Sequence, residues 1–139
     1  MAYIEPDIDL KKLIWRQKKL YKTFIPVWCM VVNRTVKFNM QGFEHLHVDG
    51  RKHMRPEADA KKRLFLLKHA PKIITQSRMV KVDIKQGHQT FSGKREVYHE
   101  LYMKVGANRP AVVVTLRTIG AGDTHFYGMR YVGKKKRTA

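Results

Sequence analysis

The sequence predicts an α+β protein in which N-terminal helices pack on a four-stranded antiparallel sheet. Helical patterns fill the first half of the chain, whereas from Arg78 onward apolar residues recur at every second position. Four consecutive alternating segments joined by short turns are typical of an antiparallel meander. Because the helices come first and the strands second, we expect the two to segregate within a single domain that spans residues 1–139.

Both ends of the chain are basic. A first helix is expected over residues 7–22, with Asp7 as its N-cap, an apolar stripe on one side and lysine and arginine on the other. We treat residues 1–24 as a basic helical extension of the domain. Residues 133–139 are expected to form a basic, flexible tail.

The segment between the first helix and the sheet has a less regular pattern. Apolar residues 24–32 favour a buried strand, and residues 36–38 favour a second, short one. The polar, histidine-rich residues 42–55 favour a short helix followed by a loop. A further helix is expected to begin at Pro56, which suits the first turn of a helix, and to end just before Pro71.

The predicted sheet has one apolar and one polar face. The apolar side chains, among them Val80, Val82 and Ile84 of its first strand, are expected to pack on the helices, because a large hydrophobic surface would otherwise remain in water. The opposite face combines phenols, a hydroxyl group and charged groups. Its members are Tyr98, Glu100, Tyr102, Lys104, Thr115 and Arg117.

The last strand can pair in two registers. In the first, which a four-residue loop over 120–123 favours, Thr118 faces His125. The residues that then lie on the polar face are Phe126, Gly128 and Arg130. The second register is shifted by one residue, which turns every side chain of the strand to the other face. The polar face then carries His125, Tyr127 and Tyr131.

The charge of the chain points to an anionic partner. Lysine and arginine number 29 and aspartate and glutamate 11, so the formal net charge is +18. Such a charge most often serves nucleic-acid binding, and we expect RNA as the partner. The single cysteine excludes an internal disulfide and favours a reducing compartment. No apolar run approaches the roughly 20 residues of a membrane span, so we expect a cytoplasmic protein without membrane contact.

Three of the seven histidines, His45, His47 and His53, lie close together beside Arg51 and Arg55. Histidine can accept and donate a proton near neutral pH, and arginine can hold a phosphate oxygen through two hydrogen bonds. RNA cleavage without a metal needs these groups, because a base removes the 2′-OH proton, cations stabilise the phosphorane and an acid protonates the leaving 5′ oxygen. The cluster therefore predicts proton transfer, with His45 and His53 as the leading pair.

Two other interpretations of this cluster stay open. It can be a solvated basic loop that only touches phosphates. It can also be a metal site with three imidazole ligands, although the surrounding cations disfavour metal binding. We therefore expect no metal and no cofactor.

The order of these segments resembles the barnase, EndoU, colicin and RelE-like superfamily of ribonucleases, and most closely its phage and mobile-element branches. The resemblance covers roughly residues 38–132. It rests on Gly42-Phe43-Glu44-His45-Leu46 and Arg51-Lys52-His53, followed by a helix over 57–68 and a four-stranded meander. It implies a compact, metal-independent ribonuclease, often a toxin, with its catalytic groups on one open sheet face and the adjoining helix.

The resemblance also implies which positions act. The histidine positions match His45 and His53, the hydroxyl and cation positions match Thr115 and Arg117, and the last-strand position matches His125, Tyr127 or Arg130. We predict as catalytic residues His45, His53, Thr115, Arg117 and Tyr127. We predict as RNA-binding or phosphate-binding residues Arg51, Arg55, Tyr102, Lys104, His125 and Arg130.

The predicted function is that of a metal-independent endoribonuclease, a toxin that acts in the bacterial cytoplasm. It would cleave RNA by attack of the 2′-OH and leave a 2′,3′-cyclic phosphate. An acidic antitoxin or immunity protein would be its protein partner. The alternative is a noncatalytic nucleic-acid-binding protein that uses the basic sheet face as a docking platform.

Overall fold

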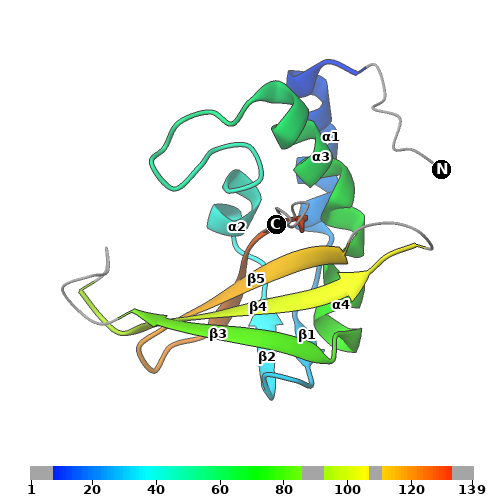
Figure 1. Ribbon diagram of the computed structural model, residues 1–139. Helices are drawn as coiled ribbons and strands as arrows, with labels where there is room; N and C mark the ends of the chain where they lie inside the picture. The colour runs from blue at the N-terminus through cyan, green and yellow to red at the C-terminus, as the bar shows by residue number, and fades with distance from the viewer. Residues whose placement is uncertain (1–7, 86–92, 107–110, 133–139) are drawn as a thin grey trace, which may run out of the picture.

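The computed structural model describes residues 8–85, 93–106 and 111–132 (Figure 1). Its helices are α1 (Leu10–Lys22), α2 (Met40–Glu44), α3 (Glu57–Leu66), the 3-10 helix η1 (Leu67–His69) and α4 (Ala70–Gln76). Its strands are β1 (Val27–Cys29), β2 (Arg34–Lys37), β3 (Met79–Lys85), β4 (Glu96–Lys104), β5 (Ala111–Ile119) and β6 (Thr124–Tyr131). The predicted α+β class is confirmed. The predicted tail over 133–139 lies outside the described residues.

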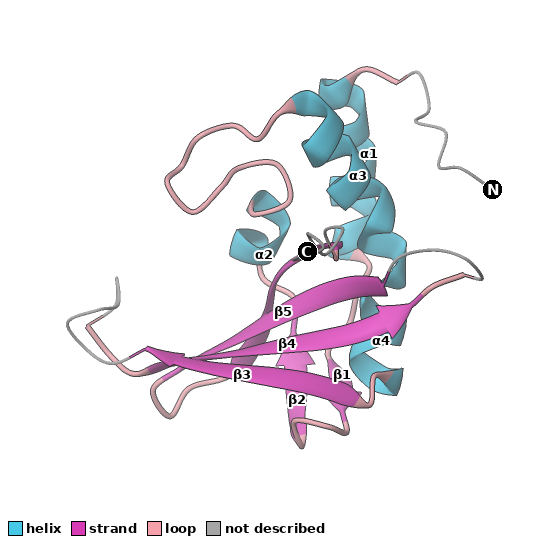
Figure 2. Ribbon diagram, viewed as in Figure 1, coloured by secondary structure: helices cyan, strands magenta, loops and turns pink. Residues whose placement is uncertain are grey.

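The strands form one mixed, six-stranded sheet in the order β1-β2-β6-β5-β4-β3 (Figure 2). The predicted meander is present, because β3 to β6 pair antiparallel in sequence order. The prediction of a four-stranded antiparallel sheet is nevertheless wrong, since the β1–β2 hairpin adds two strands and β2 lies parallel to β6. Alternation along a strand predicts its faces and not its neighbours, so the sequence did not indicate this pairing.

The sheet curls around helix α4. This helix contacts β1 at one end of the strand order and also β4 and β5 toward the other end. A proline, Pro71, lies in its first turn. The helix predicted to begin at Pro56 does end before Pro71, since α3 ends at Leu66 and η1 at His69, whereas helix α4 itself was not predicted. The chain passes through η1 and begins a new helix, whose first turn accepts a proline because the missing N–H would have had no partner within the helix.

Helix α1 packs into the core. Its N-cap is Asp9, whose carboxylate accepts a hydrogen bond from the backbone N–H of Lys12, whereas the predicted cap, Asp7, lies outside the described residues. Leu13 is fully buried, and Tyr21 joins an aromatic cluster whose ring centroids lie 5.1–6.0 Å apart. The other rings are Phe24, Phe38, Phe43 and Phe126. These contacts fasten α1 to α2 and β6, the two elements that carry the site described below.

Two predictions about buried strands need correction. The strand expected over 24–32 is only three residues long, because the chain turns directly after Cys29 and leaves Met30 exposed. The apolar side chains of β3 are also exposed, with fractions of 37% for Val80, 50% for Val82 and 45% for Ile84. Strand β3 ends the sheet, so its apolar side chains lie beyond the strands on which α4 packs.

Candidate active site

The polar face of the sheet has the composition that the alternation predicted. Tyr98 on β4 pairs with Arg117 on β5, and Glu100 pairs with Thr115, so these four side chains share one face. Glu100 forms its ion pair with Arg130 on β6, at 2.9 Å, and this pair links β4 to β6 across β5. Three adjacent strands therefore contribute polar groups to one surface.

A β-bulge at Tyr127 combines the two registers considered for the last strand. Arg117 pairs with His125, as in the second register, whereas Thr115 pairs with Gly128, which keeps Gly128 and Arg130 on the polar face as in the first. Tyr127 is the extra residue between them. The predicted Thr118–His125 pair is wrong, because Thr118 pairs with Thr124. A bulge lets consecutive positions of one strand project toward the same face and is common beside functional sites.

The bulge also corrects the places predicted for two other side chains. Phe126 pairs with Leu116 and is buried in the core, and Tyr131 pairs with Val112 and packs against the same core. Neither side chain lies on the polar face. The first register had placed Phe126 there, and the second had placed Tyr131 there. The reason is that each uniform register ignores the extra residue.

Helix α2 brings His45 to Tyr127. Asn39 caps the helix by accepting a hydrogen bond from the backbone N–H of Gly42, at 3.1 Å. A Cβ atom on Gly42 would overlap the backbone carbonyl oxygen of Phe126, so only glycine allows α2 to lie this close to β6. One turn later, at the C-cap, the ring centroid of His45 lies 4.2 Å from that of Tyr127, with 39° between the planes.

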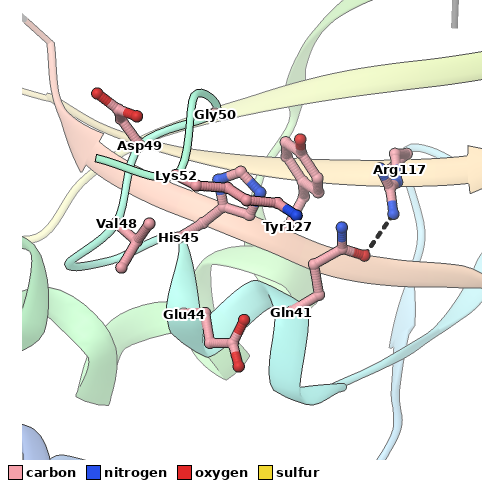
Figure 3. A pocket seen from close by; sticks show the side chains of 9 residues that line it. All are labelled: Gln41, Glu44, His45, Val48, Asp49, Gly50, Lys52, Arg117 and Tyr127. Carbon is pink, nitrogen blue, oxygen red and sulfur yellow. Dashed lines mark hydrogen bonds between the residues drawn. The ribbon is translucent and has the colours of Figure 1, made fainter. Parts of the chain in front are cut away.

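Arg117 approaches the same tyrosine ring. Its guanidinium carbon lies 4.6 Å from the ring centroid of Tyr127, which is cation–π geometry. Its Nη2 donates a hydrogen bond of 2.5 Å to Oε1 of Gln41 on α2, as Figure 3 shows. An imidazole from α2 and a guanidinium from β5 therefore both lie against one phenol ring of β6.

Two adjoining hollows open around His45 and Tyr127, which line both. The first, drawn in Figure 3, lies toward the loop after α2. Its other lining residues are Gln41, Glu44, Val48, Asp49, Gly50, Lys52 and Arg117. The second lies toward α3 and the end of β6. Its other lining residues are Arg55, Arg63, Thr115, Gly128, Met129 and Arg130.

The electrostatics of the site favour neutral histidines. Burial lowers the pKa of His45, the positive charges of Arg55 and Arg117 lower it further, and Glu44 partly opposes them. Burial and then the charge of Arg117 lower the pKa of His125 from 6.5 to about 4. Both imidazoles are therefore neutral at pH 7. His45 lines the hollows and can accept a proton there, whereas His125 is only 8% exposed and lies beneath them.

Tyr98 forms the far side of this group. Its hydroxyl donates a hydrogen bond of 2.5 Å to Oε1 of Glu96, and its ring meets that of Tyr127 edge-on at 5.4 Å. Burial and the bond to Glu96 raise the pKa of Tyr98, so the phenol keeps its proton at neutral pH. The ring of Tyr127 is therefore packed against both Tyr98 and His45.

Three arginines surround the second hollow in fixed positions. Arg55 donates from Nε to the backbone carbonyl of His45 at 2.9 Å, and Arg63 donates to Asp59 at 3.1 Å and to the carbonyl of Met129 at 3.3 Å. Arg130 is held by its ion pair with Glu100. A guanidinium fixed in this way retains N–H donors for a phosphate.

The predicted site residues divide into three groups. The structure brings six of them to the hollows: His45, Arg55, Thr115, Arg117, Tyr127 and Arg130. His125 lies below them. The lining of neither hollow includes His53, Arg51, Tyr102 or Lys104. His53 and Arg51 are exposed, and their backbone N–H groups bind the carboxylate of Asp49, which closes the loop by an Asx-type turn.

Several lining residues were missed by the sequence analysis. The role of Gln41 could not have been predicted, because nothing in the sequence indicates that α2 lies next to Arg117. Arg63 could have been found, since it stands four residues after Asp59 on the predicted helix, a spacing that pairs the two side chains. Among the described residues, no three metal-ligating side chains come together, and His45, His47 and His53 therefore form no such group.

Comparisons of the chain with models of protein families, with curated proteins and with solved structures found no match. Within the described part of the chain, no helix has both the length and the apolar character needed to cross a membrane.

Replacing Gly42 by alanine tests the close approach of α2 to β6. The added methyl group overlaps the carbonyl oxygen of Phe126, so we expect the variant to lose about 1–3 kcal/mol of stability in urea unfolding. Gly128→Ala is the matched control, because its added Cβ would lie 3.7 Å from that of His45, an ordinary contact distance. Equal stabilities of the two variants would contradict the proposed constraint.

The lowered pKa of His125 predicts a loss of stability in acid. An unfolded histidine binds its proton near pH 6.5, whereas the folded site resists protonation down to about pH 4. Stability is therefore fully present above pH 6.5 and falls as the pH decreases through this window. The difference in unfolding free energy between about pH 7 and about pH 5 should be smaller in His125→Gln than in the parent. An equal difference in the variant and the parent would contradict this prediction.

Proposed function

We propose that the protein is a metal-independent endoribonuclease that cleaves RNA by attack of the ribose 2′-OH and leaves a 2′,3′-cyclic phosphate. The observation that carries the proposal is the contact of His45 and Arg117 with one ring, that of Tyr127, at the junction of two open hollows. A proton acceptor and a fixed cation that line one hollow are two of the three groups that this reaction needs, the third being an acid for the leaving oxygen.

Each group has a role in the proposed reaction. His45, neutral because its pKa is lowered, removes the proton from the 2′-OH as the oxygen attacks phosphorus. Arg117, held by Gln41, stabilises the negative charge of the phosphorane. The bond from phosphorus to the 5′ oxygen then breaks, and the hydroxyl of Tyr127 is our candidate to protonate this leaving oxygen.

The second hollow supports binding of the flanking chain. Arg55, Arg63 and Arg130 line it, and arginine suits phosphate because its parallel N–H groups match two phosphate oxygens. Because the nucleophile is the 2′-OH, DNA would bind without being cut. The resemblance to the toxin ribonucleases supports action in the bacterial cytoplasm and an acidic antitoxin or immunity protein as partner.

The central test is cleavage of RNA in the presence of EDTA by the purified protein and its variants. We expect His45→Ala to lower kcat by about 10²–10⁴-fold and Arg117→Ala by about 10²–10³-fold, with cyclic-phosphate ends on the products of the parent. His53→Ala, which removes an exposed imidazole outside both hollows, should cleave within a few-fold of the parent. Circular dichroism checks that the Arg117 variant folds.

The same assay separates the proposal from its alternative. If RNA is bound but stays intact over structured and unstructured substrates, the protein is a noncatalytic nucleic-acid-binding protein. Binding alone does not discriminate between the two, because affinity falls with salt for any protein of this charge.

The pH dependence of cleavage identifies the base. Because the pKa of His45 lies below 6.5, kcat/KM should rise with pH, and the midpoint of this rise should lie below pH 6.5. An acidic limb centred well above pH 6.5 would exclude His45 as the base. The profile is measured with a short single-stranded substrate at constant ionic strength, so that screening of phosphate contacts does not change with pH.

A further inference from the structure

Strand β3 is the last strand in the order of the sheet, and three of its apolar side chains are exposed. Among the described strands only β4 pairs with it, and all seven of its residues lie in the pairing with β4. Figure 1 shows it along the front of the sheet, on the opposite side of β4 from β5. Its apolar side chains Val80, Val82 and Ile84 are 37–50% exposed. A strand edge with an apolar stripe is a ready template for another strand.

The sequence of β3 is complementary to itself about Val82. Lys81 precedes this residue and Asp83 follows it. If two copies of β3 pair antiparallel with Val82 opposite Val82, each Lys81 lies opposite Asp83 of the second copy, and each Val80 lies opposite Ile84. Opposite residues of an antiparallel pair point to the same face, and both opposite charges and β-branched pairs stabilise such contacts.

Other registers lack this complementarity. A shift by one residue places Lys81 opposite Val82 and so joins the polar face of one copy to the apolar face of the other. A shift by two residues places Lys81 opposite Lys81 in one direction and Asp83 opposite Asp83 in the other, and like charges directly opposite destabilise a pair. The register centred on Val82 avoids both penalties and is the one that pairs all seven residues of the strand.

We propose that two copies of the protein associate through β3 with a two-fold axis at Val82, which joins their sheets into one. The alternation of charge on the polar face supports this interface. Within one copy Lys81 pairs with Glu100 and Asp83 pairs with Tyr98, so the new contacts continue the row from Glu100 through Lys81 to Asp83 of the second copy. Both polar faces then point to the same side, and the two candidate active sites open in the same direction.

The interface is small, so the dimer is a reversible one. A single seven-residue edge buries less area than the roughly 1,200–2,000 Å² of a stable interface, and dimerisation should depend on concentration. The net charge of +18 on each copy opposes association at low salt. At an ionic strength of about 0.15 M, interactions beyond about 8 Å are screened, and the adjacent ion pairs are less affected than this long-range repulsion.

Sedimentation velocity at this ionic strength, from low to high micromolar protein, tests the proposal. The parent should change from monomer to dimer as its concentration rises. Lys81→Asp and Asp83→Lys should each remain monomeric, because each places like charges opposite one another. An equimolar mixture of these two variants should form a dimer, since every charged pair across the interface is then complementary again. The double variant Lys81→Asp/Asp83→Lys should dimerise alone.

The control variant is Lys11→Asp, on the exposed face of α1. It changes the net charge by the same amount as Lys81→Asp and should dimerise like the parent. All three substituted side chains, at positions 11, 81 and 83, are exposed, so folding, checked by circular dichroism, should be retained. A parent that stays monomeric over the whole range would overturn the proposal, as would dimerisation of both single variants or a mixture that fails to associate. Because the readout is mass, the result is independent of whether the protein cleaves RNA.

Discussion

One extra residue in β6 decides which side chains share the polar face. Without the bulge, the strand would present either His125 and Tyr127 or Gly128 and Arg130 to that face, because side chains alternate strictly along a regular strand. With Tyr127 inserted, His125 remains opposite Arg117 while Gly128 remains opposite Thr115. The ring of Tyr127 can then meet His45, Tyr98 and Arg117 together, at 4.2, 5.4 and 4.6 Å. The arrangement of both hollows follows from this single irregularity.

Burial makes positive charge on Arg117 and His125 together energetically costly. Arg117 and His125 are adjacent, both about 8% exposed, and Nε of Arg117 and Nε2 of His125 have no hydrogen-bond partner. Burial, and after it the charge of Arg117, lower the pKa of His125, so the imidazole is neutral at pH 7 and two buried cations do not lie side by side. The guanidinium of Arg117 has Gln41 as a hydrogen-bond acceptor and the face of Tyr127 as a cation–π partner. A buried guanidinium that donates to a neutral amide favours the approach of an anion.

The sequence predicted the parts of this structure that depend on local periodicity. Alternation along β4 and β5 correctly placed Tyr98, Thr115 and Arg117 on one face, because the period of two is set by backbone geometry. It failed where an outcome depends on a single inserted residue or on a distant neighbour. Three features are of this kind: the bulge at Tyr127, the parallel pairing of β2 with β6, and the packing of Gly42 against Phe126. In each, the local sequence does not indicate which distant segment it contacts.

Candidate site residues were likewise predicted where the signal is local and missed where it depends on a distant segment. His45 was found because its chemistry is visible in the sequence, and Gln41 was missed because its importance comes only from the position of α2 over Arg117. His53 has the same chemistry as His45 and lies only eight residues further along. The turn closed by the carboxylate of Asp49 nevertheless leaves it exposed and outside both hollows.

Two carboxylates, Asp59 and Glu100, lie where they orient the cations of the second hollow. Asp59 binds Arg63 and lies 3.9 Å from Arg55, and Glu100 binds Arg130, so the carboxylates arrange the three arginines of the second hollow. These carboxylate side chains are 41% and 22% exposed, and ion pairs open to solvent contribute little stability. A phosphate can therefore compete for the guanidinium groups without a large loss of stability, while the pairs limit side-chain disorder before it binds. In a chain of net charge +18, attraction to an anion is unspecific, and the position of each carboxylate decides where on the surface a phosphate is held.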